Sequence, residues 1–462
     1  MTEAMTRRLA ALAVTLAVIL AAGFAAFYFL GVAGNGAVKA RQVTLVVVTR
    51  LSPEEQAALK KVFLNSSIAR EYGIRDIEFR KVSYAQWRQL ALSGKVDGFV
   101  IGEKIVYDQL CREGAFAAFR SKKLLSLVEQ LQPSLRGTTA DGKTCWVAVG
   151  QAVYGFIVNK VFLEKHGLPE PEKWGSLLDP VYLKPLLEGV HTVSWPRPSM
   201  SGTSRTTLHG VLQRYGWTRG WQVLAAIGAE ASIVDSSEKA RDEAAEGLVA
   251  VAPAYIGYGI EAENMSKGAA VFRIPRGEGI LYISPAAVAA KAPHREAMEA
   301  FIEWLLSDEG QRALARLYYY IPVRPVKGID WVERIYREMR GNIFVFNRSL
   351  AEKVDKAVVA YYEAAIADPD ANALLKQVGR RIAELMSEGR LSRDKAEALL
   401  LELGKPLTIK DPWSGMPAVF TENYAAKIDK LLAKPEERQK FYNAVKEAAL
   451  ERYRAVLKEL GG

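Results

Sequence analysis

The chain has 462 residues, with 62 lysines and arginines against 52 aspartates and glutamates, which gives a formal net charge of +10. That length is ample for more than one domain with its own core. Charges of both signs are interspersed and no lysine- and arginine-rich block occurs, so the composition argues against a nucleic-acid partner. The interspersed charges indicate a solvated surface of mixed sign, and the positive excess is expected to help attract an anionic solute.

An uncharged apolar segment, residues 9–33, follows Arg7 and Arg8 near the first residue. A run of about 25 residues can cross a bilayer core as a helix, whereas a cleaved secretion signal usually has a shorter apolar region. We therefore predict a transmembrane anchor, with residues 1–8 in the cytoplasm and residues 34–42 as a tether. A cleaved signal is the alternative. Neither cysteine lies near this segment, which excludes a bacterial lipoprotein anchor.

Strands and helices alternate after residue 42. Residues 43–49 form a nearly continuous apolar run, which is typical of a strand covered on both faces. The Ser-Pro-Glu-Glu run at residues 52–55 predicts a helix start with a capping box. Further strands are predicted at 77–82 and 96–101, with a helix over 85–92 between them. This order indicates an α/β fold in which crossover helices join a parallel sheet.

Polar residues stand at the ends of two of these strands. Thr49 and Arg50 end the first strand, and Gly102 and Glu103 end the third. Because ligands of open α/β sheets lie beyond the carboxyl ends of the strands, we expect these four residues to share one rim. For Glu103, a favourable charge in the first turn of a helix is the simpler alternative.

A turn rich in small and hydroxyl residues opens a long predicted helix. The turn contains Ser201, Gly202, Thr203, Ser204 and Arg205. The first N–H groups of a helix lack partners, glycine admits close approach, and arginine adds a planar fork of donors. Such a turn can bind a phosphate, phosphonate or carboxylate. An N-cap without any ligand is the alternative.

The Ser201-Gly202-Thr203 turn, followed by Tyr215-Gly216-Trp217-Thr218-Arg219-Gly220-Trp221, resembles the extracytoplasmic solute-binding proteins of ABC importers. The most similar branch is often labelled ferric-iron binding, although some members bind sugar phosphates or related organophosphates. The resemblance covers about residues 43–325. It implies a monomeric, extracytoplasmic receptor of the periplasmic-binding-protein type II fold, without enzymatic activity or cofactor, that delivers its solute to membrane-embedded ABC permease subunits.

The resemblance also divides the chain into lobes. Residues 43–153 correspond to a first lobe, residues 154–275 to a second lobe, and residues 276–325 to a return to the first. A long apolar run at 146–159, with Tyr154 in its middle, is expected to cross between the lobes.

The chain continues well beyond the minimal two-lobed fold. Residues 294–317 predict one periodic helix, and residues 326–462 predict a helical C-terminal extension that packs on the lobes. A separate helical domain with its own partner is the alternative.

Two further strand ends of the second lobe carry polar or aromatic residues. Ser236 and Ser237 follow a predicted strand at 231–234, and Tyr255 and Tyr258 follow the next one. We expect these residues to line the solute site together with Tyr154.

Cys111 and Cys145 are the only cysteines. Neither belongs to a C-x-x-C pair or lies beside a histidine, which argues against a metal or redox site. Because both would lie in one lobe outside the cytoplasm, they predict a disulfide. Two thiols, one of them buried, are the alternative.

Known catalytic and metal motifs are not found in the sequence. The four histidines lack zinc-site spacing, and neither a G-x-S-x-G elbow nor a phosphate-binding P-loop occurs. Iron-specific relatives use adjacent tyrosines, but the tyrosine runs here, at 318–320 and 361–362, lie far from the expected positions. Ferric iron is therefore the alternative solute, and a membrane-anchored extracellular hydrolase is the alternative from another class.

Overall fold

The computed structural model describes residues 42–461. The predicted cytoplasmic residues 1–8, the predicted anchor at 9–33 and nearly all of the tether lie outside this part of the chain. Between residues 42 and 461, no helix combines the length and the apolar composition needed to cross a bilayer.

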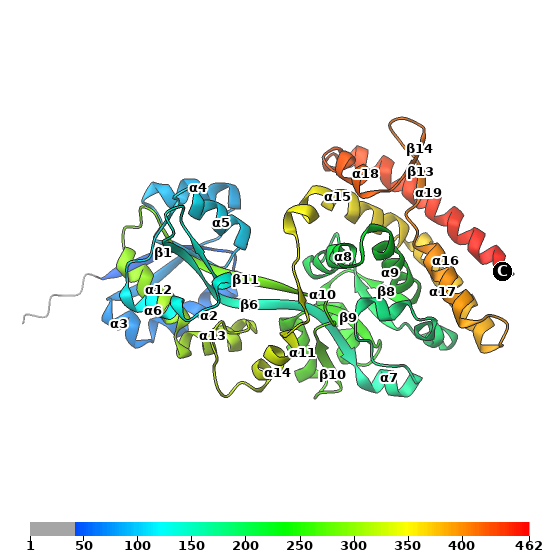
Figure 1. Cartoon of the computed structure of the whole chain (residues 1–462). Helices are drawn as coiled ribbons and strands as arrows, with labels where there is room; N and C mark the ends of the chain where they lie inside the picture. Colours follow the sequence, from blue (N-terminus) through cyan, green and yellow to red (C-terminus); the bar gives the residue numbers. More distant parts are fainter. Residues whose placement is uncertain (1–41, 462) are drawn as a thin grey trace, which may run out of the picture.

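Two α/β lobes lie side by side, joined by the long strands β6 (Thr144–Asn159) and β11 (Gly279–Ala289) (Figure 1). These two strands pair antiparallel along most of their length. One continuous sheet runs through both lobes in the strand order β2-β1-β3-β11-β6-β9-β7-β8. The sheet itself therefore connects the lobes.

The first lobe is built on a parallel core. Strand β1 (Val43–Thr49) pairs in parallel with β2 (Ile74–Arg80) and β3 (Gly98–Val100). Its helices are α2 (Pro53–Leu64), α3 (Ser67–Glu71), α4 (Tyr84–Ser93), α5 (Lys104–Arg112) and α6 (Lys122–Glu129), and its short elements are β4 (Phe116–Ala117), η1 (Pro133–Leu135) and β5 (Arg136–Thr138). The predicted capping box at residues 52–55 is confirmed, because Ser52 accepts from the Glu55 N–H and Glu55 accepts from the Ser52 N–H.

The sheet is mixed, whereas the sequence predicts a parallel one. Strand β11 is antiparallel to both β3 and β6. The reason is that β6 leaves the first lobe and β11 returns to it, so the two strands cross in opposite directions. Apart from a short parallel contact of β11 with residues 343–344, parallel pairing joins strands that begin and end within one lobe.

The predicted helix at 294–317 is two helices, α12 (Arg295–Leu306) and α13 (Asp308–Tyr318). Ser307 separates them with an extended backbone and accepts a hydrogen bond from the Gly310 N–H, which makes it the N-cap of α13. The apolar spacing continues through the break, so periodicity alone does not reveal it.

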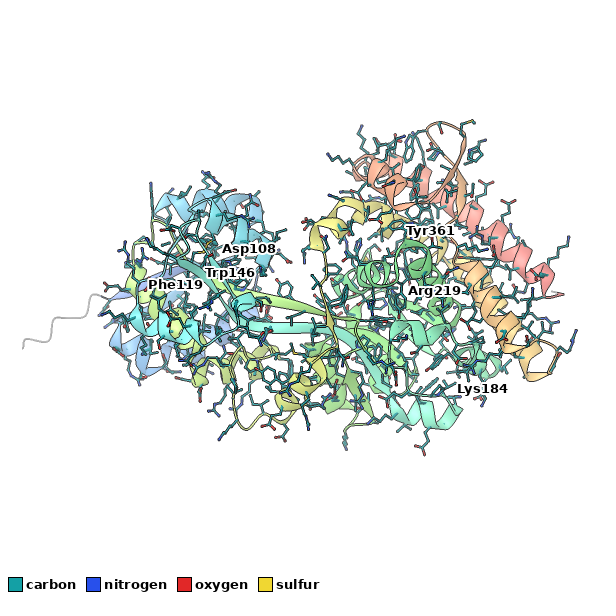
Figure 2. All side chains as sticks on the ribbon, in the orientation of Figure 1. Asp108, Phe119, Trp146, Lys184, Arg219 and Tyr361 are labelled. Carbon is teal, nitrogen blue, oxygen red and sulfur yellow. A yellow bond between two sulfur atoms is a disulfide. The ribbon has the colours of Figure 1, made fainter. Side chains whose placement is uncertain are left out.

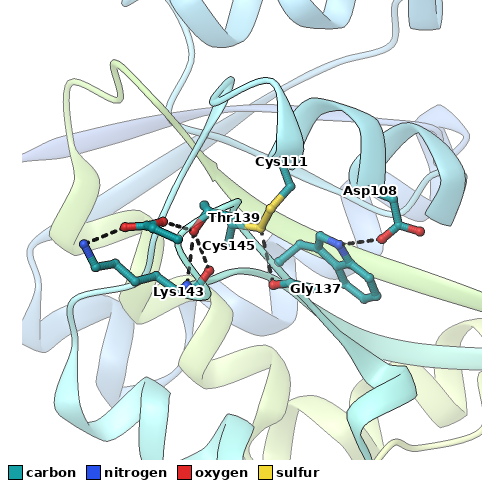
Figure 3. The surroundings of a disulfide bond; sticks show 8 residues. Asp108, Cys111, Gly137, Thr139, Lys143 and Cys145 are labelled. Atoms are coloured by element: carbon teal, nitrogen blue, oxygen red, sulfur yellow. Dashed lines mark hydrogen bonds and ion pairs between the residues drawn. A yellow bond between two sulfur atoms is a disulfide. The ribbon is translucent and has the colours of Figure 1, made fainter.

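A disulfide joins Cys111 at the end of α5 to Cys145 at the start of β6, with Cα atoms 6.1 Å apart (Figure 3). Beside it, the Trp146 indole N–H donates to Asp108 at 3.0 Å. Gly137 lies against the same ring, and a Cβ there would clash with Trp146. These contacts fix the origin of β6, the strand that leads to the second lobe.

The second lobe has a similar arrangement. Strand β7 (Val193–Pro196) is parallel to β8 (Ala231–Val234) and to β9 (Val251–Tyr255), while β10 (Ala270–Arg273) is antiparallel to β6. Its helices are α7 (Lys160–His166), η2 (Trp174–Leu178), η3 (Pro180–Glu188), α8 (Gly202–Tyr215), α9 (Trp217–Glu230), α10 (Ser237–Ala245) and α11 (Ile256–Met265).

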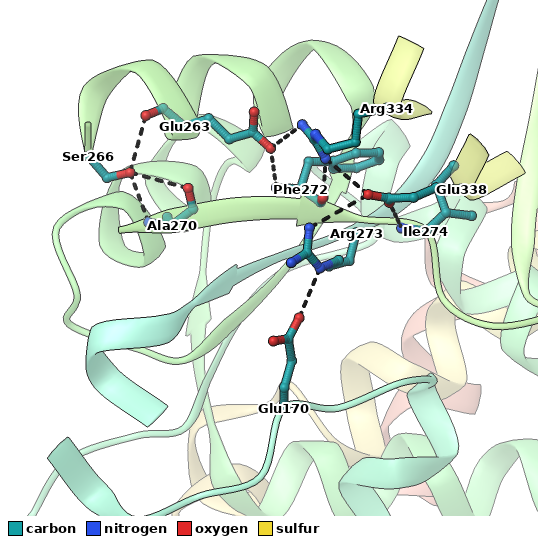
Figure 4. Close-up of polar contacts among 9 residues, drawn as sticks. All are labelled: Glu170, Glu263, Ser266, Ala270, Phe272, Arg273, Ile274, Arg334 and Glu338. Atoms are coloured by element: carbon teal, nitrogen blue, oxygen red, sulfur yellow. Dashed lines mark hydrogen bonds and ion pairs between the residues drawn. The ribbon is translucent and has the colours of Figure 1, made fainter. Parts of the chain in front are cut away.

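The chain returns to the second lobe through α14 (Asp330–Met339). Arg334 donates to Glu263 at 2.5 Å and to the Phe272 carbonyl at 2.9 Å, and Glu338 accepts from the Ile274 N–H at 3.3 Å (Figure 4). Helix α14 is therefore bound to β10 and α11, and it leads the chain into the C-terminal region.

The C-terminal region is mostly helical and covers the outer side of the second lobe (Figure 1). Its elements are β12 (Ile343–Phe344), α15 (Arg348–Ala365), α16 (Pro369–Ser387), α17 (Arg393–Leu403), β13 (Thr408–Lys410), β14 (Pro417–Val419), α18 (Glu422–Ile428), η4 (Leu431–Ala433) and α19 (Pro435–Glu459). The Tyr361 ring, labelled in Figure 2, lies 4.5 Å from Trp221 of α9 and 4.0 Å from Phe420. The C-terminal helices thus share one apolar core with the second lobe.

Candidate functional site

The strand ends of the first lobe point toward the second lobe. Thr49 and Val100, at the ends of β1 and β3, are paired, and Val100 lies opposite Ala286 of β11. Strand β11 runs from the second lobe into the first, and β3 is antiparallel to it. The carboxyl ends of β1 and β3 are therefore directed at the second lobe.

The strand ends of the second lobe point back in the same way. Tyr255, at the end of β9, lies opposite Tyr154 of β6. Because β6 enters this lobe from the first and β9 is antiparallel to it, the carboxyl end of β9 is directed at the first lobe. Strands β7 and β8 run parallel to β9. We call the region where the two sets of ends face each other the interlobe site.

One face of the crossing strands carries tyrosine side chains. Tyr282 lies opposite Ala152, and Tyr154 lies opposite Ile280. Residues opposite each other in an antiparallel pair share a face, as do residues two apart in one strand. Tyr154 and Tyr282 therefore project from the same face of the β6–β11 ladder.

Gly150 places a third tyrosine on this face. Gly150 precedes Ala152 by two residues, and a Cβ on it would lie 2.7 Å from a ring carbon of Tyr320. Glycine is the residue that leaves room for the Tyr320 ring here. We call Tyr154, Tyr282 and Tyr320 the tyrosine floor. Burial raises the pKa of all three phenols, so they are neutral hydrogen-bonding groups at physiological pH.

The first lobe contributes charged and aromatic groups beside this floor. The Glu103 N–H donates to the Tyr84 hydroxyl at 3.1 Å, and the Arg50 guanidinium lies 5.2 Å from the centre of the Tyr84 ring. The Arg50 side chain is exposed and donates to the Val82 carbonyl at 3.1 Å. Burial raises the pKa of Glu103, against the opposing effect of Arg348.

Thr49 and Gly102 also lie at this rim, but their contacts are with other residues of the first lobe. The Thr49 hydroxyl is buried and accepts from the Leu51 N–H at 3.2 Å. A Cβ on Gly102 would lie 2.6 Å from the Trp87 ring. Both residues therefore shape the rim and offer little side-chain surface to a solute.

Two helix N-termini meet in the second lobe. Ser201 caps α8 by accepting from the Ser204 N–H at 3.0 Å, and its hydroxyl lies 2.6 Å from that of Ser237 in the first turn of α10. Ser236 is the N-cap of α10. A Cβ on Gly202 would meet no atom within 4 Å, so open space lies in front of the first turn of α8.

Helix α8 directs different side chains to different neighbours. Thr206 lies one turn after Gly202, on the same face, and its hydrogen bond to Tyr154 opposes the effect of burial on the pKa of that tyrosine. Thr203 and Ser204 are buried within the lobe.

The Arg205 guanidinium is engaged elsewhere, by both carboxylate oxygens of Asp355 on α15. His209, one turn on, lies 3.0 Å from the same carboxylate. The sequence assigns the Arg205 donors to a solute, but here they hold helix α15 against α8.

Tyr255 and Tyr258 contact each other, with ring centres 4.6 Å apart. Tyr255 shares the face of its partner Tyr154 and so adjoins the tyrosine floor. The Tyr258 hydroxyl donates to Glu238, and Arg241 lies 5.5 Å from the centre of its ring. Tyr258 therefore belongs to a polar network on the lobe surface.

Helix α15 lies along the second lobe and reaches the first lobe at its N-terminal residue. Its first residue, Arg348, lies 2.8 Å from Glu103 of the first lobe. Glu363, near its other end, accepts from Arg197 at 2.8 Å and from the Ser199 hydroxyl at 2.6 Å, in the turn before α8. One helix of the C-terminal region thus contacts both lobes.

Sequence reasoning missed Tyr84, Tyr282, Tyr320 and Arg348. Tyr84 follows β2, so the rule of strand ends could have found it. Tyr282 and Tyr320 are brought to the floor by the pairings of Tyr282 with Ala152 and of Gln151 with Ile321, which no local pattern reveals. The contact of Arg348 with Glu103 depends on where α15 packs, which the local sequence does not reveal.

Two lobes with opposed strand ends, joined by two crossing strands, define a two-lobed binding protein. Residues 95–332, just over half of the chain, match the family described as bacterial extracellular solute-binding protein, and the chain belongs to this family. Members of the family bind solutes and are not enzymes.

The chain is also similar to individual proteins. The phosphoglycerate transport regulatory protein PgtC of Salmonella typhimurium is 31% identical over 170 residues, which cover 37% of this chain and 40% of that relative, so the chain spans well under half the length of the curated protein. An extracellular solute-binding protein from Bordetella parapertussis is 16% identical, with a TM-score of 0.54 over 69% of this chain and 98% of that one. An ABC transporter structure from Clostridium perfringens is also 16% identical, with a TM-score of 0.50 over 68% and 97%. These structures show the α/β periplasmic-binding-protein fold.

Proposed function

We propose that this chain is the extracytoplasmic receptor of an ABC importer and that it binds a small anionic solute between its lobes. The observation that carries this proposal is the meeting of the α8 and α10 N-termini at Ser201 and Ser237, with open space in front of Gly202. Helix N-termini present unpaired N–H groups and positive dipole ends to a ligand. We expect the permease to receive the solute when the lobes open.

The remaining groups of the interlobe site suit an oxyanion. Thr206 and the neutral phenols of the tyrosine floor provide hydrogen bonds, and the exposed Arg50 provides positive charge. The similarity to a phosphoglycerate transport regulatory protein favours an organophosphate within the wider class of organophosphates, phosphonates and carboxylates.

Ferric iron is a second candidate because three tyrosines share the floor, and phenolates bind this ion in iron-specific relatives. Two features weigh against it. Burial raises the pKa of these phenols, which opposes the phenolate form. In addition, residues 42–461 contain no group of three or more histidine, cysteine, aspartate or glutamate side chains placed to hold a metal ion.

We further propose that residues 9–33 anchor the receptor to the outer face of the cell membrane. The support is their length and lack of charge. Cell fractionation tests this, because an anchored chain sediments with membranes and keeps its first residues. A shortened chain in the extracellular medium would indicate a cleaved signal instead.

Isothermal titration of the full-length protein against 3-phosphoglycerate, inorganic phosphate, a dicarboxylate, a neutral sugar and a ferric salt tests the proposed function. We expect saturable binding of one anion per chain, with no turnover of the bound compound. Preferred binding of the neutral sugar would contradict the anionic class. A visible phenolate-to-iron absorption band with the ferric salt would favour the second candidate.

A further inference from the structure

Helix α15 brings a positive charge to the interlobe site from outside the two lobes. Arg348 is the first residue of this helix, and its side chain is 42% exposed. One terminal nitrogen of its guanidinium, Nη2, lies 2.8 Å from Glu103, and Nε lies 3.4 Å from Glu352. A guanidinium has five N–H donors, so these two ion pairs leave donors for another acceptor.

Arg348 also shares its partner Glu103 with Tyr84. Its charge acts on the phenols of Tyr84 and Tyr154, as does the charge of Glu103. Tyr84 stands beside Glu103 in the first lobe, and Tyr154 stands beside Thr206 in the second. The guanidinium therefore reaches the first lobe from a helix that is docked on the second lobe.

Glu103 makes this placement important for an anion. Its carboxylate is only 18% exposed and stands at the same rim as Arg50. A negative solute that entered the interlobe site would be repelled by an uncompensated carboxylate there. Arg348 offsets the charge of Glu103, although it also contacts the more exposed carboxylate of Glu352, and Arg50 adds a second positive charge at the rim.

We propose that Arg348 of the C-terminal region, although it is paired with Glu103, is a solute-binding residue of the interlobe site that donates to an acidic group of the solute. This inference rests on the function proposed above. It assigns part of the binding site to a helix that lies beyond the residues matched by the family. The chemical class it fits is a solute with a phosphate, phosphonate or carboxylate group, because a guanidinium binds such groups through two parallel hydrogen bonds.

The competing interpretation is that the Glu103–Arg348 pair only holds the lobes at a fixed distance. Single substitutions separate the two interpretations. Arg348→Ala removes the donors and leaves Glu103 to repel the anion, whereas Glu103→Gln breaks the ion pair but keeps the arginine. If the ion pair only held the lobes at a fixed distance, both substitutions would alter the solute affinity equally.

The experiment is isothermal titration of the full-length variants with 3-phosphoglycerate and with inorganic phosphate as probes. We expect Arg348→Ala to weaken binding by about 10- to 100-fold, Arg348→Lys to recover part of it, and Glu103→Gln to bind as wild type or more tightly. Arg393→Ala is the matched control, because it breaks another ion pair of the C-terminal region, with Asp179, far from the floor. Thermal unfolding without solute checks that each variant folds. If Arg348→Ala does not fold, the affinity of Arg348→Lys is compared with wild type instead.

Each outcome decides the question. Wild-type affinity in Arg348→Ala, or equal weakening in Arg348→Ala and Glu103→Gln, overturns the role of Arg348 and leaves the proposed function intact. If the wild-type protein binds neither probe nor any other anion, the anionic class and the role of Arg348 fail together. Anion binding that depends on Arg348 and not on Arg393 supports both.

Discussion

Arg205 of α8 and Asp355 of α15 form a two-pronged ion pair between the second lobe and the C-terminal region. Burial alone would raise the pKa of Asp355, but hydrogen bonds from His209 and Arg205 hold that pKa well below its usual range. This carboxylate is therefore ionised in the folded protein, and its ion pair with Arg205 holds α15 against α8.

The first prediction is that Arg205→Ala lowers stability more than it lowers solute affinity. Arg205 is 43% exposed, so solvent screening reduces the value of its hydrogen bonds, and we expect a loss of about 1–2 kcal/mol in the free energy of unfolding. Chemical denaturation and titration with 3-phosphoglycerate measure the two quantities. A large loss of affinity at unchanged stability would contradict this prediction and show that Arg205 binds the solute.

The same ion pair predicts a pH dependence. Because the pKa of Asp355 is depressed in the fold, its stabilisation is complete above the ordinary aspartate value of about 3.9 and is lost as the pH falls toward the folded value. Asp355→Asn should therefore cost stability at pH 7 and progressively less below pH about 4. A stability difference between the two proteins that does not change with pH would contradict this assignment.

A third prediction concerns Glu230 at the end of α9. Its side chain is 1% exposed, neither carboxylate oxygen has a hydrogen-bond partner among the described residues, and burial followed by the charge of Asp179 raises its pKa well above the ordinary value. A raised pKa means that the free energy of unfolding falls as the pH rises above about 4.3, where the unfolded chain ionises first. Glu230→Gln should remove this fall, so its stability relative to wild type should rise from pH 4 to pH 7. Thermal unfolding across that range measures the difference, and a flat difference would show that Glu230 ionises normally in the fold.

The fourth prediction concerns the disulfide between Cys111 and Cys145, which are separated by 34 positions in the sequence. Closing a loop of this length stabilises a fold by about 3–4 kcal/mol when only the entropy of the unfolded chain is counted. A reducing agent should therefore lower the melting temperature of the wild-type protein and leave a double Cys→Ala variant unaffected. Two alkylated thiols in unreduced native protein would exclude the bond.

Two glycines provide a fifth, paired prediction. Gly202→Ala places a methyl group in the open space before α8, so it should weaken solute binding and leave stability within about 1 kcal/mol of wild type. Gly150→Ala places its methyl group 2.7 Å from the Tyr320 ring, so it should cost about 1–3 kcal/mol of stability by overpacking. Titration and thermal unfolding of both variants compare these effects. Unchanged affinity in Gly202→Ala would show that the solute does not approach the first turn of α8.

Local signals account for the parts of the fold that the sequence predicts well. The bounds of β1 and the capping box at Ser52 and Glu55 follow from apolar spacing and cap chemistry over a few residues. The rule of strand ends brings together the ends of β1 and β3, where the Arg50 N–H donates to the Ile101 carbonyl at 3.2 Å. The break at Ser307 also has a local signal, a serine followed by two acidic residues, but the continuous apolar spacing conceals it.

Long-range pairing accounts for what the sequence does not reveal. The tyrosine floor depends on a register that places Tyr282 opposite Ala152, 130 positions apart. Asp355, which engages Arg205, lies 150 positions further along the chain. A single sequence contains no signal for partners at such distances, so the composition of the site could be predicted only where strand ends define it.

The ladder between β6 and β11 also limits how the lobes can move. Slipping by one residue would turn the floor tyrosines to the opposite face, so sliding of one lobe along the other is strongly opposed. Rotation about the ribbon leaves this pairing in place, and two-stranded ribbons adopt larger twists than wide sheets. The easy motion of this receptor should therefore be a rotation about the ribbon, with the tyrosine floor as its stationary axis.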